Sequence, residues 1–184
     1  MRVMEGLIQP YLEYLLENPN SLLARIYGLF TIKTKYFIKL NVMVMQNTFI
    51  ESPNHRNAIK FDLKGSRDGR RSKNVLSRWS MGRVERAKTE EEFFRCYETN
   101  KILKDINFIQ INDQVKRIQL SATQSAKNSS DPQPNGLVCL SEHDQKRICK
   151  QISKDADFLA LYNLMDYSVF LVIEHLETPK DTGD

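Results

Sequence analysis

The chain of 184 residues has few of the side chains that build disulfide frameworks or metal centres. It contains three cysteines and three histidines, at Cys96, Cys139, Cys149, His55, His143 and His175. They form no CxxC pair and show no metal-ligand spacing. An odd number of widely spaced cysteines suits a reducing compartment. We therefore interpret all six as packing or surface residues and assign no metal ligand.

The sequence also lacks a long hydrophobic run. Its most apolar window, Phe37–Phe49, is interrupted by Lys39 and by the amides of Asn41, Gln46 and Asn47. That window falls short of the ~20 apolar residues needed to cross a bilayer. Acidic residues also interrupt the first apolar positions, so no signal peptide is expected. A cytoplasmic setting is the resulting prediction.

Positive charge is concentrated in one segment. The formal net charge is +4, yet ten basic residues fall between Lys60 and Lys88 against only three acidic ones. Such a segment can bind phosphates of a nucleotide, a nucleic acid or an anionic membrane, although a solvated surface is the commoner explanation. Nucleic-acid binding would favour aromatic residues among the cations as stacking platforms. Trp79 is the only aromatic residue between Gly65 and Lys88, and this scarcity disfavours nucleic-acid binding.

The hydrophobic patterns predict a mixed α+β chain. Helices are expected from Pro10 to Leu16, over residues 90–102 and after Ser141, which can cap its helix. Strands are expected over residues 26–34, 36–45, 58–63 and 169–173. The continuous apolar run Met43–Met45 is typical of a strand covered on both faces. Residues 121–136 are polar and contain proline, and they are expected to form a disordered linker.

A first candidate for chemistry is the segment Asp62–Ser66, with the sequence DLKGS. Lys64 ends a predicted strand and could bind a phosphate, with backbone N–H groups beside Gly65 adding to the site. Arg70 could hold a second phosphate through its guanidinium. The spacing alone, however, fits a solvated strand end with an incidental salt bridge better.

A second candidate is Met165–Ser168, with the sequence MDYS. Asp166 stands between a helix and an apolar strand, where a carboxylate could accept a proton from a hydroxyl group. Taken in isolation, a turn aspartate that bonds its own backbone is the commoner case. A phosphate-binding Lys64 and a proton-accepting Asp166 together make up the parts of phosphoryl transfer.

These two motifs, with Arg70 four positions after Ser66, resemble the signatures of phosphatidylinositol phosphate kinases. Further segments resemble the same family in the same order. They are ENPNSLLARIYGLF (17–30), MVMQNTF (43–49), KDINF (104–108) and DADFLALYNLMDYS (155–168). The resemblance covers most of the chain, from about residue 11 to 174.

The resemblance implies a fold distantly similar to protein kinases, with an antiparallel sheet and flanking helices around a nucleotide cleft. Residues 1–48 would be the remainder of the N-lobe, and residues 49–184 a partial C-lobe. It further implies ATP, Mg²⁺ and a phosphoinositide presented at the cytoplasmic face of an anionic membrane. The expected reaction converts phosphatidylinositol 4-phosphate to the 4,5-bisphosphate.

Site residues follow from the resemblance position by position. Asn47 and Phe49 would lie in the hinge beside the adenine. Asp62 and Lys64 would contact the nucleotide, and Arg70 would bind a substrate phosphate. Asp166 would be the catalytic carboxylate, assisted by Lys64.

The sequence departs from the family pattern in several places. A glycine-rich strand pair with its lysine, and a metal-binding aspartate, have no counterpart here. Val172 replaces a usual glycine and Arg67 a usual threonine. Because phosphoryl transfer depends on charge neutralisation, we expect the chain alone to be nearly inactive. A catalytically dead phosphoinositide- or membrane-binding module is the alternative.

Overall fold

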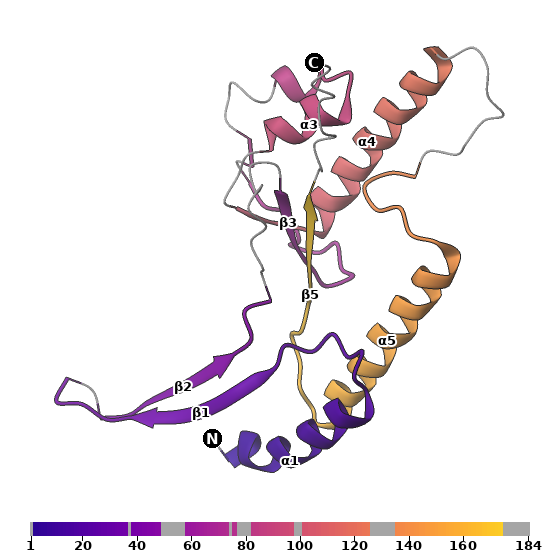
Figure 1. Ribbon diagram of the computed structural model, residues 1–184. Helices are drawn as coiled ribbons and strands as arrows, with labels where there is room; N and C mark the ends of the chain where they lie inside the picture. Colours follow the sequence, from indigo (N-terminus) through magenta and orange to yellow (C-terminus); the bar gives the residue numbers. More distant parts are fainter. Residues whose placement is uncertain are drawn as a thin grey trace, which may run out of the picture. The chain divides into compact units, whose positions relative to one another are not determined.

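The structure is a computed structural model of residues 1–184 that contains both helices and strands (Figure 1). The α+β class predicted from the sequence is confirmed. The residues it describes are 2–36, 38–48, 58–73, 75–76, 82–97, 101–125 and 135–174. The chain divides into two compact units. The first combines residues 1–50 with 140–166, and the second combines residues 51–139 with 167–184. These units are not assignments of kinase lobes, so the predicted lobe boundaries stay predictions.

The first unit is built on two helices, α1 (Arg2–Glu17) and α5 (Glu142–Leu161). Their contact is aromatic, because the ring of Tyr14 stacks on that of Phe158 with centroids 4.3 Å apart. Helix α1 begins eight residues before Pro10, where the sequence had indicated a first turn. A proline inside a helix removes one hydrogen bond, but the apolar face continues across it through the buried Leu7 and Tyr11.

The start of α5 is as predicted. The Ser141 hydroxyl accepts a hydrogen bond from the Asp144 N–H at 3.0 Å and donates one to the Asp144 carboxylate at 2.8 Å. Side-chain capping of this kind satisfies a backbone donor that the helix cannot satisfy itself.

A buried carboxylate joins three segments of the first unit. Asp155 on α5 is 5% exposed and accepts four hydrogen bonds. Donors are the hydroxyls of Tyr14 (2.6 Å) and Ser21 (2.8 Å), the Leu22 N–H (2.7 Å) and the Gln151 amide (2.9 Å). Because a buried charge without partners is costly, this set of donors fixes the segment after α1 against α5.

Strands β1 (Ile26–Ile32) and β2 (Leu40–Met45) form a two-stranded antiparallel ribbon. Its base is tied to α1, because the Tyr11 hydroxyl accepts a hydrogen bond from the Ile26 N–H at 3.2 Å. The prediction that residues 43–45 are covered on both faces is wrong. Their side chains are 42–50% exposed, since no further strand or helix of the described chain covers this ribbon on both sides.

The second unit contains a three-stranded sheet in the order β4-β3-β5. Central β3 (Ala58–Leu63) pairs in parallel with β4 (Ile102–Lys104) and antiparallel with β5 (Val169–Glu174). The bounds of β3 agree with the prediction, and β5 extends one residue further. Both runs are rich in apolar residues, as expected of strands that help build a core.

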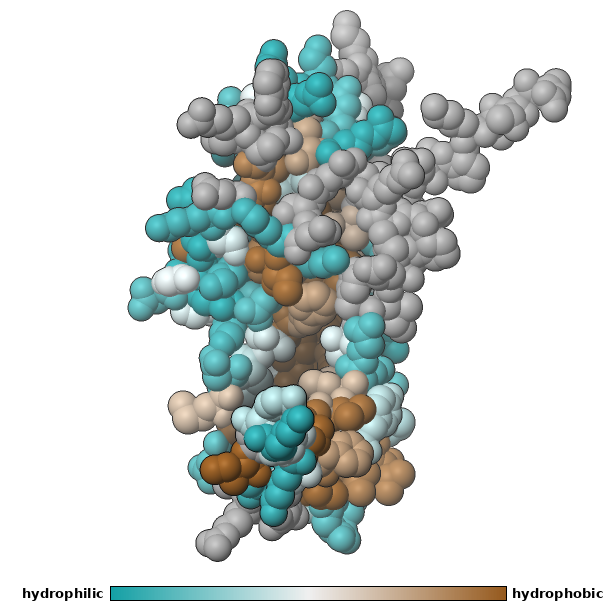
Figure 2. Space-filling model, turned by 90° about the vertical axis from the view of Figure 1, so that its left-hand side faces the viewer, coloured by the Kyte–Doolittle hydropathy of each residue, from teal (hydrophilic) through white to brown (hydrophobic). Residues whose placement is uncertain are grey.

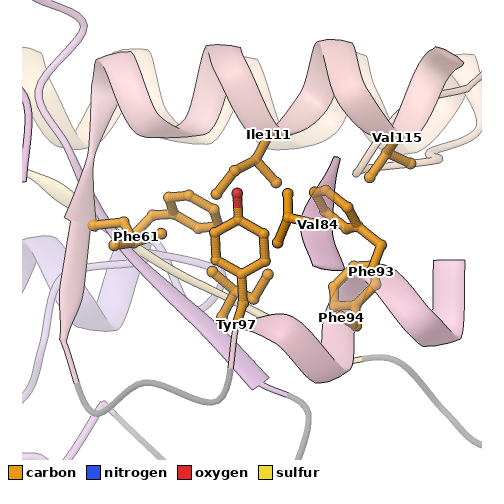
Figure 3. Packing of buried hydrophobic residues seen from close by; sticks show 9 residues of the cluster. Phe61, Val84, Phe93, Phe94, Tyr97, Ile111 and Val115 are labelled. Carbon is orange, nitrogen blue, oxygen red and sulfur yellow. The ribbon is translucent and has the colours of Figure 1, made fainter. Parts of the chain in front are cut away.

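The core of this unit lies between the sheet and two helices, α3 (Glu90–Cys96) and α4 (Asp105–Ser125) (Figure 3). Figure 3 shows Phe61, Phe93, Phe94 and Tyr97 gathered beneath Ile111 and Val115 of α4. The helix predicted over residues 90–102 ends at Cys96. Its predicted last residue, Ile102, instead begins β4, where pairing with β3 replaces helical hydrogen bonding.

Helix α4 includes residues 121–125, so the first five residues of the predicted linker are helical. Residues 126–134 lie outside the described residues. The end of that linker folds back on α4: the Gly136 N–H donates to the Gln119 side chain at 2.9 Å, and the Leu137 N–H donates to Asn112 at 2.9 Å. Gly136 has φ +74°, and a Cβ there would lie 2.3 Å from the Asn112 Oδ1. Only glycine fits this position without displacing Asn112.

Candidate functional site

The last residue of the second motif, Ser168, directly precedes β5, the strand that pairs with the β3 end of the first motif. In the β3–β5 register, Asp62 pairs with Phe170 and Leu63 with Val169. Ser168 lies two positions before Phe170, which places it on the same face as Asp62. The Ser168 hydroxyl donates a hydrogen bond to the Asp62 carboxylate. The Ser168 side chain therefore links the end of the MDYS segment to Asp62 of the DLKGS segment.

Arg70 crosslinks the end of β3 to the start of α4. Its Nε donates to Asp105 Oδ2 at 2.8 Å, and its Nη2 donates to Asp62 Oδ2 at 3.0 Å and to the Asp62 carbonyl at 2.5 Å. The Arg70 side chain is only 12% exposed. The hydrogen bond from Ser168 lowers the pKa of Asp62, and Arg70 lowers it further, against the opposing effect of burial.

Asp105 belongs to this site, and the sequence analysis assigned it no role. Its Oδ1 accepts hydrogen bonds from the Lys64 N–H at 3.0 Å and the Gly65 N–H at 2.8 Å. Gly65 has φ +71°, a conformation that favours glycine and turns its N–H toward Asp105. Burial raises the pKa of Asp105, but its hydrogen bonds, led by that from Arg70, outweigh burial and lower it overall.

Two backbone donors of the predicted phosphate site already have an acceptor within the chain. The backbone N–H groups beside Gly65 were expected to bind a phosphate, but the Asp105 carboxylate occupies the N–H groups of both Lys64 and Gly65. A carboxylate from the same chain satisfies these donors as an external anion would. Lys64 itself is half-buried at this strand end.

The remaining predicted residues belong to the first unit or lie outside the described residues. Asp166 is exposed, has φ +65° and belongs to the first unit, in the turn that precedes β5. Asn47 is exposed just after β2, also in the first unit. Phe49 lies outside the described residues. The structure thus brings together Asp62, Lys64 and Arg70 of the predicted set, and adds Asp105 and Ser168. The available signal for Asp105 was its place in the KDINF segment, one of the segments that carried the family resemblance.

The described residues contain no group of three or more His, Cys, Asp or Glu side chains arranged to hold a metal ion. The carboxylates of Asp62 and Asp105 are already engaged by Arg70, Ser168 and backbone N–H groups. This donor set does not fit Mg²⁺, and no reaction step is assigned to the ion. Among the described helices, none is both long and apolar enough to span a membrane.

A cavity of about 690 Å³ also lies in the second unit, beside α4. Its walls combine apolar side chains such as Val84 and Ile111 with the basic Arg71 and Arg117. None of the residues predicted from the motifs lines it, so it is separate from the site around Asp62.

Comparison with known proteins identifies the family. The family description "Phosphatidylinositol-4-phosphate 5-Kinase" matches residues 1–183. A phosphatidylinositol 4-phosphate 5-kinase of Plasmodium falciparum is 26% identical over 95% of this chain and 8% of its own length. One of Schizosaccharomyces pombe is 25% identical over 95% of this chain and 18% of its own length. The mouse phosphatidylinositol 4-phosphate 5-kinase-like protein 1 is 26% identical over 90% of this chain and 30% of its own length.

The chain therefore belongs to the phosphatidylinositol-4-phosphate 5-kinase family, as the resemblance predicted. It spans less than a third of the length of these relatives. No solved structure matches it. Several segments that carried the resemblance meet in the structure: Asp155 binds Ser21 in the first unit, and Arg70 binds Asp105 in the second.

Proposed function

We propose that this chain forms part of the catalytic core of a phosphoinositide kinase, which transfers the γ-phosphoryl group of ATP to phosphatidylinositol 4-phosphate. One observation carries the proposal: the Ser168 hydroxyl binds the Asp62 carboxylate across the β3–β5 pair. This contact joins the two motifs that would supply the chemistry. Membership of the family supports the reaction class.

In the proposed reaction, the inositol hydroxyl oxygen attacks the γ-phosphorus of ATP, and the bond to the bridging oxygen of ADP breaks. The Asp166 carboxylate accepts the hydroxyl proton, and the Lys64 ammonium neutralises charge on the phosphoryl oxygens. Lys64 follows β3 directly, and its backbone is held by Asp105. A fixed backbone limits how far the ammonium can move from its productive position.

Arg70 has a positioning role in this proposal. Its guanidinium holds Asp62 and Asp105, and through them the strand end that carries Lys64. Direct contact between Arg70 and a substrate phosphate stays a prediction of the family resemblance. The same holds for Asn47 and Phe49 beside the adenine, for Asp62 at the nucleotide, and for ATP and Mg²⁺ as cofactors.

Because the chain alone is expected to be nearly inactive, the test uses a protein that joins this chain to the glycine-rich strand pair and the metal-binding aspartate of the family pattern. It measures transfer of labelled phosphate from ATP to phosphatidylinositol 4-phosphate in vesicles. Asp166→Asn and Lys64→Met should each lower kcat by at least about 100-fold, since each removes one group that acts in the transition state. The matched controls are Asp157→Asn and Lys150→Met, which change the same residue types at exposed positions of α5. Both controls should turn over at the unmodified rate.

Two results would count against the proposal. A protein with those parts restored that binds these vesicles yet transfers no phosphate would favour the non-catalytic binding module. An Asp166→Asn variant as active as its Asp157→Asn control would remove Asp166 from the chemistry.

A further inference from the structure

The tip of the β1–β2 ribbon exposes large apolar side chains. Tyr36 is 82% exposed and Ile38 is 92% exposed, both between the two strands. Figure 1 shows the ribbon projecting from the helices of its unit, with this connection at its far end. Scattered apolar residues are normal on a protein surface, but exposure this complete at two positions of one connection is a reason to look for a partner.

The apolar surface continues from the tip along one face of the ribbon. Phe30 pairs with Val42, and Ile32 pairs with Leu40, so these four side chains share a face. Three of them are 43–54% exposed. The opposite face is polar at the same level, where the Thr31 hydroxyl lies 3.1 Å from the Asn41 side chain. The distal ribbon is therefore amphipathic.

The charge of this region has a single sign. Lys33, Lys35 and Lys39 are all exposed at the tip. No aspartate or glutamate occurs from Asn18 to Ile50. The Lys35 ammonium lies 4.9 Å from the centroid of the Tyr36 ring, so a cation and an aromatic ring already share one position. Figure 2 shows hydrophobic and hydrophilic residues side by side on the face of the molecule that it views.

We propose that the ribbon tip docks on the surface of an anionic lipid bilayer. Tyr36 and Ile38 would enter the interfacial layer, where aromatic and aliphatic side chains lose contact with water. Lys33, Lys35 and Lys39 would remain at the headgroups, because a lysine can keep its charge in water while its stem lies on apolar surface.

The three lysines at the ribbon tip favour a bilayer over a protein strand as the binding partner of this surface. A strand added to the ribbon edge would bury backbone groups and alternate side chains, and would leave the three tip lysines unused. An anionic membrane uses both the apolar side chains and the cations. The inference does not depend on phosphoryl transfer, and it concerns residues outside the basic segment 60–88.

The experiment is sedimentation of the purified protein with vesicles of phosphatidylcholine alone or with phosphatidylserine, without phosphoinositide and without ATP. Wild type should bind only the phosphatidylserine vesicles, and more weakly in 0.5 M salt, where charges are screened over roughly 4 Å. Lys33→Gln, Lys35→Gln and Lys39→Gln together should lower the partition coefficient on the order of 100-fold. Tyr36→Ser with Ile38→Ser should lower it roughly tenfold or more.

The matched control is Lys146→Gln, Lys150→Gln and Lys154→Gln on α5, which makes the same change of charge at exposed positions of the same unit. It should bind nearly as well as wild type. A separate experiment measures how deeply the ribbon tip enters the bilayer. A Trp79→Phe, Tyr36→Trp protein carries its only tryptophan at the tip, and its emission should shift to shorter wavelength on phosphatidylserine vesicles.

The proposal is overturned if the tip and α5 variants lose binding equally, or if the tip tryptophan shows no shift while the protein is bound. It is also overturned if wild type forms a concentration-dependent dimer that the tip variants abolish, with no vesicle binding. Turnover of a short-chain, water-soluble phosphatidylinositol 4-phosphate separates this inference from the proposed kinase activity. Vesicle binding by the ribbon tip can fail while turnover of the soluble substrate is seen, and the reverse can also occur.

Discussion

Arg70 Nε lies 2.8 Å from Asp105 Oδ2, which joins two residues that are 35 positions apart in the chain. The same carboxylate receives the N–H groups of Lys64 and Gly65 through its other oxygen. Asp105 therefore fixes both the backbone that follows β3 and the position of the Arg70 side chain. The backbone around Lys64 therefore depends on Asp105 as well as on the DLKGS motif itself.

Replacing Asp105 with alanine should destabilise the second unit. The substitution leaves two backbone donors and the Arg70 Nε without their acceptor, and an unsatisfied buried polar group costs about 1–3 kcal/mol. We expect the free energy of unfolding in urea to fall by at least that range. Asp113→Ala, at an exposed position of the same helix, should change it by less than about 0.5 kcal/mol. Equal losses in the two variants would show that the Asp105 contacts contribute nothing specific.

Acid should weaken the same unit in a predictable direction. The pKa values of Asp62 and Asp105 are both lowered in the folded state from 3.8. A carboxyl whose pKa is lower when folded contributes stability that is present above its unfolded pKa, and loses it as the pH falls through the folded pKa.

The contribution should thus be complete above about pH 5 and decline below about pH 4. Urea unfolding from pH 7 to pH 3 measures it. The pH profile of Asp105→Asn should be flatter than that of wild type over the acidic range. A profile parallel to wild type would contradict the lowered pKa of Asp105.

Asp155 should control the stability of the first unit alone. Asp155→Ala removes the acceptor of four donors, and Tyr14→Phe removes one of them, at a cost of about 1.5–3 kcal/mol for a hydrogen bond to a charged group. Hydrogen exchange of backbone amides should quicken in α1 and α5 for both variants, and more for Asp155→Ala. Exchange in β3 and α4 should stay unchanged. The exposed Asp157→Ala serves as the control on the same helix.

The elements that were predicted well share a strong local signal. The β3 bounds followed from a short apolar run that ends at a glycine, and α5 from its Ser141 cap and the one-sided spacing of its apolar residues. Such signals are contained within a few neighbouring positions. They therefore survive when the rest of the fold is unknown.

The failures have a different origin. Helix α4 was not predicted, because many polar residues along it dilute its apolar stripe, and only packing against the sheet shows that Ile111 and Val115 are buried. The residues 43–45 were misjudged because their burial depends on neighbours that a strand pattern does not specify. Asp105 was missed because its role arises from contacts with Lys64, Gly65 and Arg70, far away in the chain.

The Gly136 contact has a practical consequence for engineering. The side chains of Gln119 and Asn112 bind the backbone of Gly136 and Leu137 and so hold it against α4. Because these contacts come after residues 126–134, we expect the core to tolerate a change in the number of residues in that segment. Doubling the length of a closed loop costs only about 0.6 kcal/mol of chain entropy. We therefore expect an affinity tag or a fluorescent reporter inserted between residues 126 and 134 to leave the packing of α4 on the sheet unchanged. This position would serve as an insertion site for purification and imaging of this protein.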